Sequence, residues 1–250
     1  MNCVTYGMEH AQTIILIHGG GLSWWNFRQE AEILKNGYRV VLPLLDGHAG
    51  SDRPFTSIED NAEEIISMID RDFGGSVLLI GGLSLGAQVV LEILSRRKNI
   101  CRHALVESPS VIPSAVTKAL TGPMVGCSYA LIKNRAFSKL QFRSLHIQKD
   151  LFEDYYRDTC RISKADMKAF LKASVSYRLK EEIKECRADV HVFAGERETG
   201  VVLKSARLIK EIIPGCSLRI LPHLYHGEFS LNHPGDYADI SLAIVRRCRV

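Results

Sequence analysis

The chain has 250 residues, of which 46% are hydrophobic and 24% charged, a balance typical of a globular domain that needs no metal or disulfide staple. The formal net charge of +4 is only mildly basic and the basic residues are scattered, which disfavours a nucleic-acid-binding protein. Seven cysteines without a CxxC pair argue against a disulfide framework or a zinc cluster, and favour a reducing, cytoplasmic location.

Short apolar runs alternate with helical patterns in the first hundred residues. In chain order, the sequence predicts a strand at 13–17, a helix at 25–36, a strand at 38–42, a helix at 57–73, a strand at 76–80, a helix at 85–95 and a strand at 103–106. The apolar run at 14–17 is too short for a signal core or a membrane span, so no membrane partner is expected. Alternating strands and helices indicate parallel strands joined by right-handed crossovers.

The rhythm changes after Pro109. Residues 110–187 contain helical patterns and no convincing strand, whereas strands are predicted again at 189–194 and 217–221, with helices at 201–213 and 236–247. We therefore expect an α/β fold, with a mostly parallel sheet, helices on both faces and an inserted helical lid. The core would comprise residues 1–109 and 188–250, and the lid residues 110–187.

The strongest chemical signal is Gly82-Leu83-Ser84-Leu85-Gly86, between a predicted strand and a predicted helix. A sharp strand-to-helix turn crowds its neighbours, which explains the small residues two positions either side of the serine. Such a turn lifts the hydroxyl to the carboxyl edge of the sheet, at a helix N-terminus that favours developing negative charge. Ser84 is therefore the predicted nucleophile; the alternative is a glycine turn without catalytic meaning.

A second glycine-rich segment, His18-Gly19-Gly20-Gly21, follows the first buried strand. Glycines allow backbone amides to approach an oxyanion without obstruction by side chains. The amides of Gly20 or Gly21, together with that of Leu85, are candidates for an oxyanion hole. A plain glycine-rich turn is the alternative, and His18 itself is interpreted as structural.

These motifs occur together with Asp46-Gly47-His48-Ala49-Gly50-Ser51-Asp52 and Tyr225-His226-Gly227. In this order and spacing they resemble the α/β-hydrolase superfamily, in its lid-bearing branch, over nearly the whole chain except the lid. The resemblance implies that the loop at 46–52 is mainly structural, so Asp46 and His48 are not preferred as catalytic residues. It also implies a nucleophile, an acid and a histidine in that chain order.

The resemblance places the histidine after the last strand, where His226 matches best. His223 lies too close to the strand end and His233 stands beside Pro234. The pair His223-x-x-His226 lacks a suitably spaced third ligand, so no metal site is expected. Where the family carries an aspartate, this chain has Glu198, which would orient the histidine; Glu107 is the reserve candidate.

Aromatic residues are candidates for the substrate pocket. Trp24 and Trp25 follow the oxyanion loop, and Phe137, Phe142 and Tyr155 lie in the predicted lid. They either contact substrate or pack the helices against the core.

The sequence thus predicts a serine hydrolase that cleaves a carboxylic ester or thioester of a small, largely apolar acid through a Ser-His-Glu triad and an acyl-enzyme. The substrate is a small molecule and no cofactor is expected. A carbon–carbon bond hydrolase, an acyltransferase and a non-catalytic signalling protein on the same fold remain alternatives. An aspartate-nucleophile dehalogenase or epoxide hydrolase is disfavoured because position 84 is serine. Oligomeric state is left open.

Overall fold

The computed structural model describes residues 1–246. Within them, one sheet has the strand order β1-β3-β2-β4-β5-β6-β7, and only β1 is antiparallel to its neighbour. The strands are β1 (Cys3–Tyr6), β2 (Thr13–Ile17), β3 (Arg39–Pro43), β4 (Val77–Leu83), β5 (Cys101–Glu107), β6 (Asp189–Gly195) and β7 (Ser217–Leu221). The mostly parallel sheet confirms the predicted fold class, although the edge strand β1 was not predicted.

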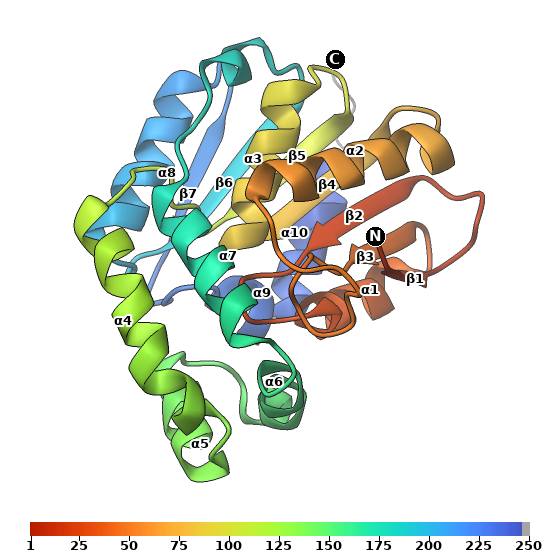
Figure 1. Cartoon of the computed structure of the whole chain (residues 1–250). Coiled ribbons are helices and arrows are strands. Elements are labelled where there is room, and N and C mark those ends of the chain that lie inside the picture. Colours follow the sequence, from red (N-terminus) through yellow and green to blue (C-terminus); the bar gives the residue numbers. More distant parts are fainter. Residues whose placement is uncertain (247–250) are drawn as a thin grey trace.

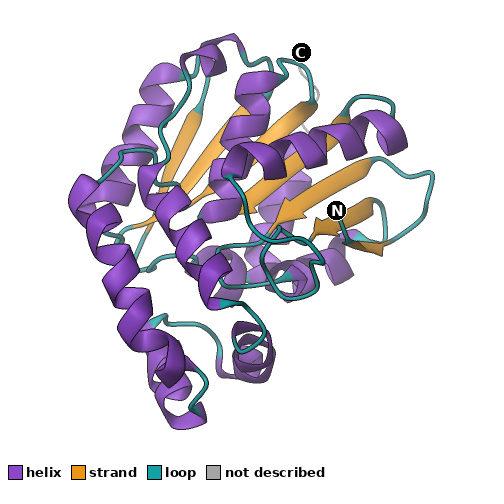
Figure 2. Cartoon of the chain, in the orientation of Figure 1, coloured by secondary structure: helices purple, strands orange, loops and turns teal. Residues whose placement is uncertain are grey.

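Helices cover both faces of this sheet (Figures 1 and 2). They are η1 (Trp24–Phe27), α1 (Arg28–Leu34), α2 (Ile58–Phe73), α3 (Leu85–Arg96), α4 (Ala115–Ile132), α5 (Arg135–Ser144), η2 (Lys149–Leu151), α6 (Phe152–Thr159), α7 (Lys164–Ser176), η3 (Glu181–Glu185), α8 (Gly200–Ile212), α9 (Glu228–Asn232) and α10 (Pro234–Val245). Residue 247, the last residue of the predicted final helix, lies outside the described residues.

Two hydrophobic clusters lie on opposite faces of the sheet because side chains alternate along each strand. In β2, Ile15 and Ile17 belong to the cluster that also contains buried residues of α2, α3 and α8, whereas Ile14 and Leu16 belong to the cluster with residues of α1 and α10. All four side chains are buried, as expected for a central strand of a parallel sheet covered on both faces.

Local signals define α2 as the sequence predicted. The Ser57 hydroxyl accepts a hydrogen bond from the Asp60 amide at 2.9 Å, which caps the first turn. Gly74 ends the helix in the left-handed conformation, with φ +66°, that glycine adopts at little cost.

The insertion between β5 and β6 contains helices and no strand among its described residues. Among the described residues it contains α4 to α7 and two short 3-10 segments, and α4 lies beside α7 (Figure 1). This segment projects beyond the carboxyl ends of the strands, which is the edge where parallel α/β sheets bind ligands.

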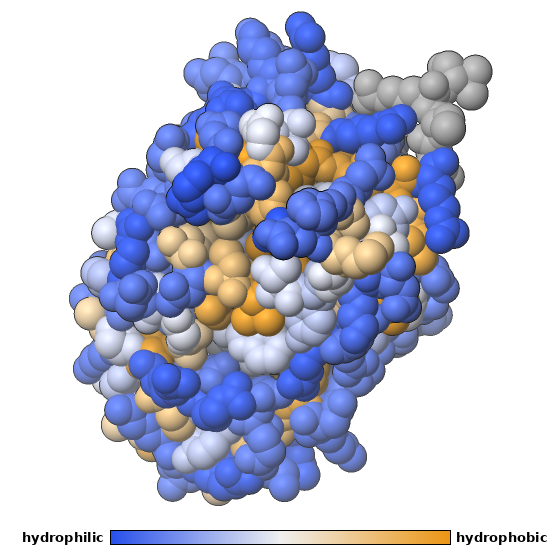
Figure 3. All heavy atoms as spheres, turned by 90° about the vertical axis from the view of Figure 1, so that its right-hand side faces the viewer, coloured by the Kyte–Doolittle hydropathy of each residue, from blue (hydrophilic) through white to orange (hydrophobic). Residues whose placement is uncertain are grey.

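The surface around the sheet edge at β1 is mainly polar. Figure 3 shows hydrophilic side chains over most of this face, with hydrophobic ones gathered across its middle. Among residues 1–246, no helix is long and apolar enough to cross a membrane. All six cysteines in this range carry free thiols, and Cys248 lies outside it.

Candidate active site

Ser84 occupies a strained turn between β4 and α3. Its backbone has φ +53° and ψ −108°, a conformation that few non-glycine residues adopt. A Cβ atom on Gly82 would lie 2.5 Å from the Gly86 backbone, and one on Gly86 would lie 2.2 Å from the Ile17 carbonyl oxygen. Both glycines are therefore required sterically, and together they permit the turn that presents Ser84 at the carboxyl edge of the sheet.

The loops after β6 and β7 bring a carboxylate and an imidazole to this serine. His226 Nε2 lies 3.0 Å from Ser84 Oγ, and His226 Nδ1 lies 2.8 Å from Glu198 Oε2. The Glu198 side chain is fully buried, whereas that of His226 is 49% exposed. A carboxylate can only accept, so Nδ1 carries the proton and Nε2 is free to accept the serine hydroxyl hydrogen.

Ser108 holds the other oxygen of the same carboxylate. Its hydroxyl donates to Glu198 Oε1 and accepts the Gly227 amide at 3.3 Å, so it connects the acid loop to the histidine loop. Its own backbone is fixed at φ +52°, and its amide donates to the Phe193 carbonyl oxygen at 2.8 Å. Sequence reasoning missed Ser108, although its place two residues after the strand predicted at 103–106 was an available signal.

Glu107, the reserve candidate for the acid, lies elsewhere. It is buried at the end of β5, and its Oε1 accepts the Ser230 amide at 3.1 Å. Burial raises the pKa of Glu107 to about 8. A carboxyl group with this pKa is mostly protonated at neutral pH, which suits a structural hydrogen-bonding role better than the stabilisation of an imidazolium.

The glycine loop after β2 is shaped by two buried histidines. The Gly21 amide donates to His48 Nε2 at 3.0 Å, and the Leu45 amide donates to His18 Nε2 at 3.1 Å. Burial lowers the pKa of His18 to about 3 and that of His48 to about 4, so both rings are neutral and can accept these bonds.

Of the three predicted oxyanion-hole amides, that of Gly21 is therefore already engaged. Gly20 and Leu85 remain as a facing pair, because a Cβ atom on Gly20 would lie 3.5 Å from Leu85 Cβ. Leu85 begins α3, where first-turn amides lack intrahelical acceptors.

A cavity of about 410 Å³ opens beside Ser84. The core contributes Gly19, Gly20, Leu22, Leu83 and Leu231, and the loops after β6 and β7 contribute residues 197–199 and 225–227. The helical insertion contributes residues 144–147, from the end of α5 and the loop that follows. The insertion thus forms one wall of the cavity.

A stack of three side chains stands at the cavity beside His226. The rings of His146 and Tyr225 are parallel, with centroids 4.0 Å apart, and the Arg197 guanidinium lies 5.3 Å from the Tyr225 ring centroid. Arg197 Nη1 also donates to the Tyr225 hydroxyl at 3.4 Å. Sequence reasoning did not assign these residues; only the position of Tyr225 next to His226 could have indicated one of them.

The five aromatic residues predicted to bind substrate are not among the residues that line this cavity. Trp25 is buried and its Nε1 donates to Asp158 Oδ2 at 2.9 Å, while Phe142 and Tyr155 are buried with ring centroids 5.1 Å apart. Trp24 and Phe137 are partly buried; Trp24 packs against the cluster that contains Ile14 and Leu16, and Phe137 packs against the cluster that contains Ile15 and Ile17. Large apolar rings gain free energy from burial, and these residues pack within the insertion and η1 and do not line the cavity beside Ser84.

Comparison with known proteins agrees with the fold. Residues 14–240 match the alpha/beta hydrolase family, so the chain belongs to that family. Epoxide hydrolase 3 of Xenopus tropicalis is 28% identical over 107 residues, which cover 41% of this chain and only 29% of that protein.

Solved structures share the architecture over almost the full length. A thermophilic esterase from Thermogutta terrifontis superposes with a TM-score of 0.79 at 14% identity, covering 98% of this chain and 92% of the esterase. The enol-lactonase from Burkholderia xenovorans LB400 gives a TM-score of 0.83 at 13% identity, covering 98% and 96%. At identities this low, the superpositions establish the common fold alone. The chemistry therefore has to be argued from the site.

Proposed function

We propose that the protein is a serine hydrolase that cleaves a carboxylic ester or thioester of a small, largely apolar acid. The observation that carries this proposal is the continuous contact from Ser84 through His226 to the buried carboxylate of Glu198, with distances of 3.0 and 2.8 Å. Nucleophile, base and orienting acid are recognised by such geometry rather than by sequence position.

The proposed reaction begins with attack of Ser84 Oγ on the substrate carbonyl carbon, while the serine proton passes to His226 Nε2. The amides of Gly20 and Leu85 stabilise the oxyanion. Collapse of the tetrahedral intermediate breaks the bond to the alcohol or thiol, which takes the proton from His226, and the acyl group remains on Ser84. Water then attacks the acyl-enzyme by the same steps and releases the acid.

Cavity size and lining support the substrate class. A volume of about 410 Å³ lies at the lower end of the range for small-molecule sites, and Leu22, Leu145, Ile147 and Leu231 supply apolar walls. Because residues 144–147 form one wall, we assign the insertion at 110–187 the role of a lid that limits the length of the acyl or alcohol group.

Two other reaction classes use the same machinery. Carbon–carbon bond hydrolysis and acyl transfer differ only in the bond cleaved or in the acceptor. Epoxide hydrolysis, suggested by the name of the Xenopus relative, is disfavoured because an attacking carboxylate is needed there and Ser84 occupies the nucleophile turn. A non-catalytic role does not account for the hydrogen-bonded arrangement of Ser84, His226 and Glu198.

Fluorophosphonate labelling combined with a chain-length series of p-nitrophenyl esters tests the proposal. Wild-type protein should be labelled and should hydrolyse short and medium esters, whereas Ser84→Ala should lose labelling and roughly 10³-fold or more of kcat. Ser95→Ala, at the far end of the same helix, is the matched control and should retain both. Absence of labelling in wild type, or near-normal turnover by Ser84→Ala, would overturn the serine mechanism.

A further inference from the structure

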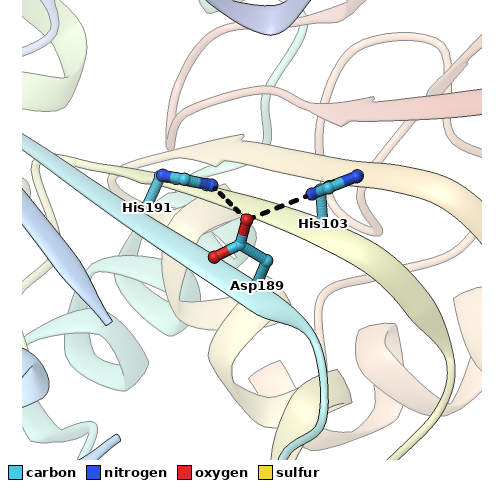
Figure 4. Close-up of side chains that lie close together, drawn as sticks. All are labelled: His103, Asp189 and His191. Carbon is cyan, nitrogen blue, oxygen red and sulfur yellow. Dashed lines mark ion pairs between the residues drawn. The ribbon is translucent and has the colours of Figure 1, made fainter. Parts of the chain in front are cut away.

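A second group of side chains lies at the other end of the sheet from Ser84. His103 is on β5, and Asp189 and His191 are the first and third residues of β6 (Figure 4). The register pairs His103 with Asp189, and residues two apart on a strand share a face. All three side chains therefore project from the same face of two hydrogen-bonded strands, which fixes their relative positions independently of any loop.

Both imidazoles point at one carboxylate oxygen. His103 Nδ1 lies 3.5 Å and His191 Nε2 lies 3.1 Å from Asp189 Oδ2, as Figure 4 shows, and the three atoms all lie within 4.8 Å of one another. In a tetrahedral zinc site, with bonds of about 2.0–2.2 Å, neighbouring ligand atoms are separated by about 3.3–3.5 Å. Both separations between a histidine nitrogen and the Asp189 oxygen are therefore close to the value that a shared ion requires, and the third separation is at most 4.8 Å.

His103 provides an independent indication of a missing ligand. Its side chain is only 1% exposed. Its Nδ1 reaches only the Asp189 carboxylate, at 3.5 Å, and its Nε2 has no hydrogen-bond partner within the described part of the chain. Buried polar atoms without partners are rare because they lose hydration without compensation.

The surroundings also resemble those of metal ligands. His191 Nδ1 lies 2.8 Å from Ser217 Oγ on the neighbouring strand β7, an outer contact of the kind that orients a ligating imidazole. Asp189 is 33% exposed, which leaves a route from solvent.

We propose that His103, Asp189 and His191 bind a divalent transition-metal ion, with zinc as the best match and water as the fourth ligand. Two imidazole nitrogens and one carboxylate oxygen suit zinc, whereas calcium and magnesium prefer all-oxygen sites. The ion joins β5 and β6 at the edge remote from Ser84, so it stabilises the fold and takes no part in hydrolysis.

The test uses the full-length chain, freed of metal with EDTA and titrated with Zn²⁺ alone. Calorimetry should show one equivalent bound at this site, and Tm should rise with Zn²⁺ concentration because the ion binds only the folded chain tightly. Co²⁺ in place of Zn²⁺ should give the intense visible absorption of a four-coordinate ion with nitrogen and oxygen ligands.

Variants identify the ligands. His103→Ala and Asp189→Asn should each weaken Zn²⁺ binding at least about tenfold, since even outer-contact changes reach that size. Controls are His10→Ala, an exposed histidine elsewhere, and Cys216→Ser, a nearby thiol; both should bind as wild type. Asp189→Asn alters a partly exposed side chain, so it remains informative if His103→Ala does not fold.

Three outcomes would overturn the site: no Zn²⁺ binding by wild type, unchanged binding by both ligand variants, or a Co²⁺ spectrum with the thiolate charge-transfer band that Cys216→Ser removes. Ester hydrolysis by wild type should be the same before and after EDTA treatment. The zinc site and the serine mechanism can therefore fail separately.

Discussion

Replacement of Ser108 by alanine tests whether the buried Glu198 carboxylate is held in place by a serine outside the proposed triad. The Ser108 hydroxyl donates to Glu198 Oε1, while the other oxygen of Glu198 contacts His226. Removing this donor frees the carboxylate to rotate away from the imidazole. It also leaves the Gly227 amide, which neighbours His226, without its acceptor.

The expected magnitude follows from the kind of bond that is lost. A hydrogen bond to a charged group contributes about 1.5–3 kcal/mol, and each 1.36 kcal/mol corresponds to a factor of ten in rate. If the loss is expressed in the transition state, kcat should fall roughly ten- to a hundredfold. KM should stay nearly constant because Ser108 is not among the residues that line the cavity.

Steady-state hydrolysis of a short p-nitrophenyl ester, with Tm measured in parallel, provides the assay. Ser108→Gly lacks the hydroxyl but suits the backbone at φ +52°, so it should lose the same kcat with a different change in Tm. Ser241→Ala removes a comparably buried serine hydroxyl within α10 and serves as the control.

Two results would refute this reasoning. Ser108→Ala with kcat within twofold of wild type would mean that Glu198 needs no such support. Equal losses of kcat and Tm in Ser108→Ala and Ser241→Ala would show that any buried serine has the same general effect on packing.

Further predictions address the acid, its neighbour and the cavity. Glu198→Gln should lower kcat by orders of magnitude with little change in Tm, whereas Glu107→Gln should retain most activity; the reverse pattern in the ester assay would exchange their roles. The pKa of Glu107 is raised to about 8 in the folded state, so the folded chain holds this proton more tightly than the unfolded chain does. Wild type should therefore lose stability as pH rises from about 4.5 to 8, and the Tm of Glu107→Gln relative to that of wild type should increase over the same range. Ile147→Trp should fill part of the cavity and shift preference to shorter esters, measured as kcat/KM across a chain-length series. The control Phe142→Ala alters a buried side chain that does not line the cavity, so it should chiefly lower Tm. An unchanged chain-length profile in Ile147→Trp would remove residues 144–147 from the proposed substrate site.

Much of the core architecture was predictable from local patterns. Continuous apolar runs such as residues 13–17 identify buried parallel strands, and the amphipathic period with Ser57 and Gly74 at its ends identifies α2. The edge strand β1 was not predicted because it has only four residues and most of them are half-buried. Such a segment shows no clear alternation of buried and exposed positions. The predicted helix at 25–36 is divided into η1 and α1, a local change in hydrogen bonding that hydrophobic spacing does not encode.

The sequence by itself determined the strand-helix alternation and the glycine-flanked turn at Ser84, because backbone sterics and side-chain periodicity act over a few neighbouring residues. Only the tertiary structure decided that Glu198 rather than Glu107 lies against His226, that Ser108 supports it, and that residues 144–147 line the cavity in place of the predicted aromatics. The same holds for His103, Asp189 and His191, which strand register brings together from distant parts of the chain. Those contacts depend on how separate elements pack, and packing depends on the shape of the whole core, which no local pattern contains.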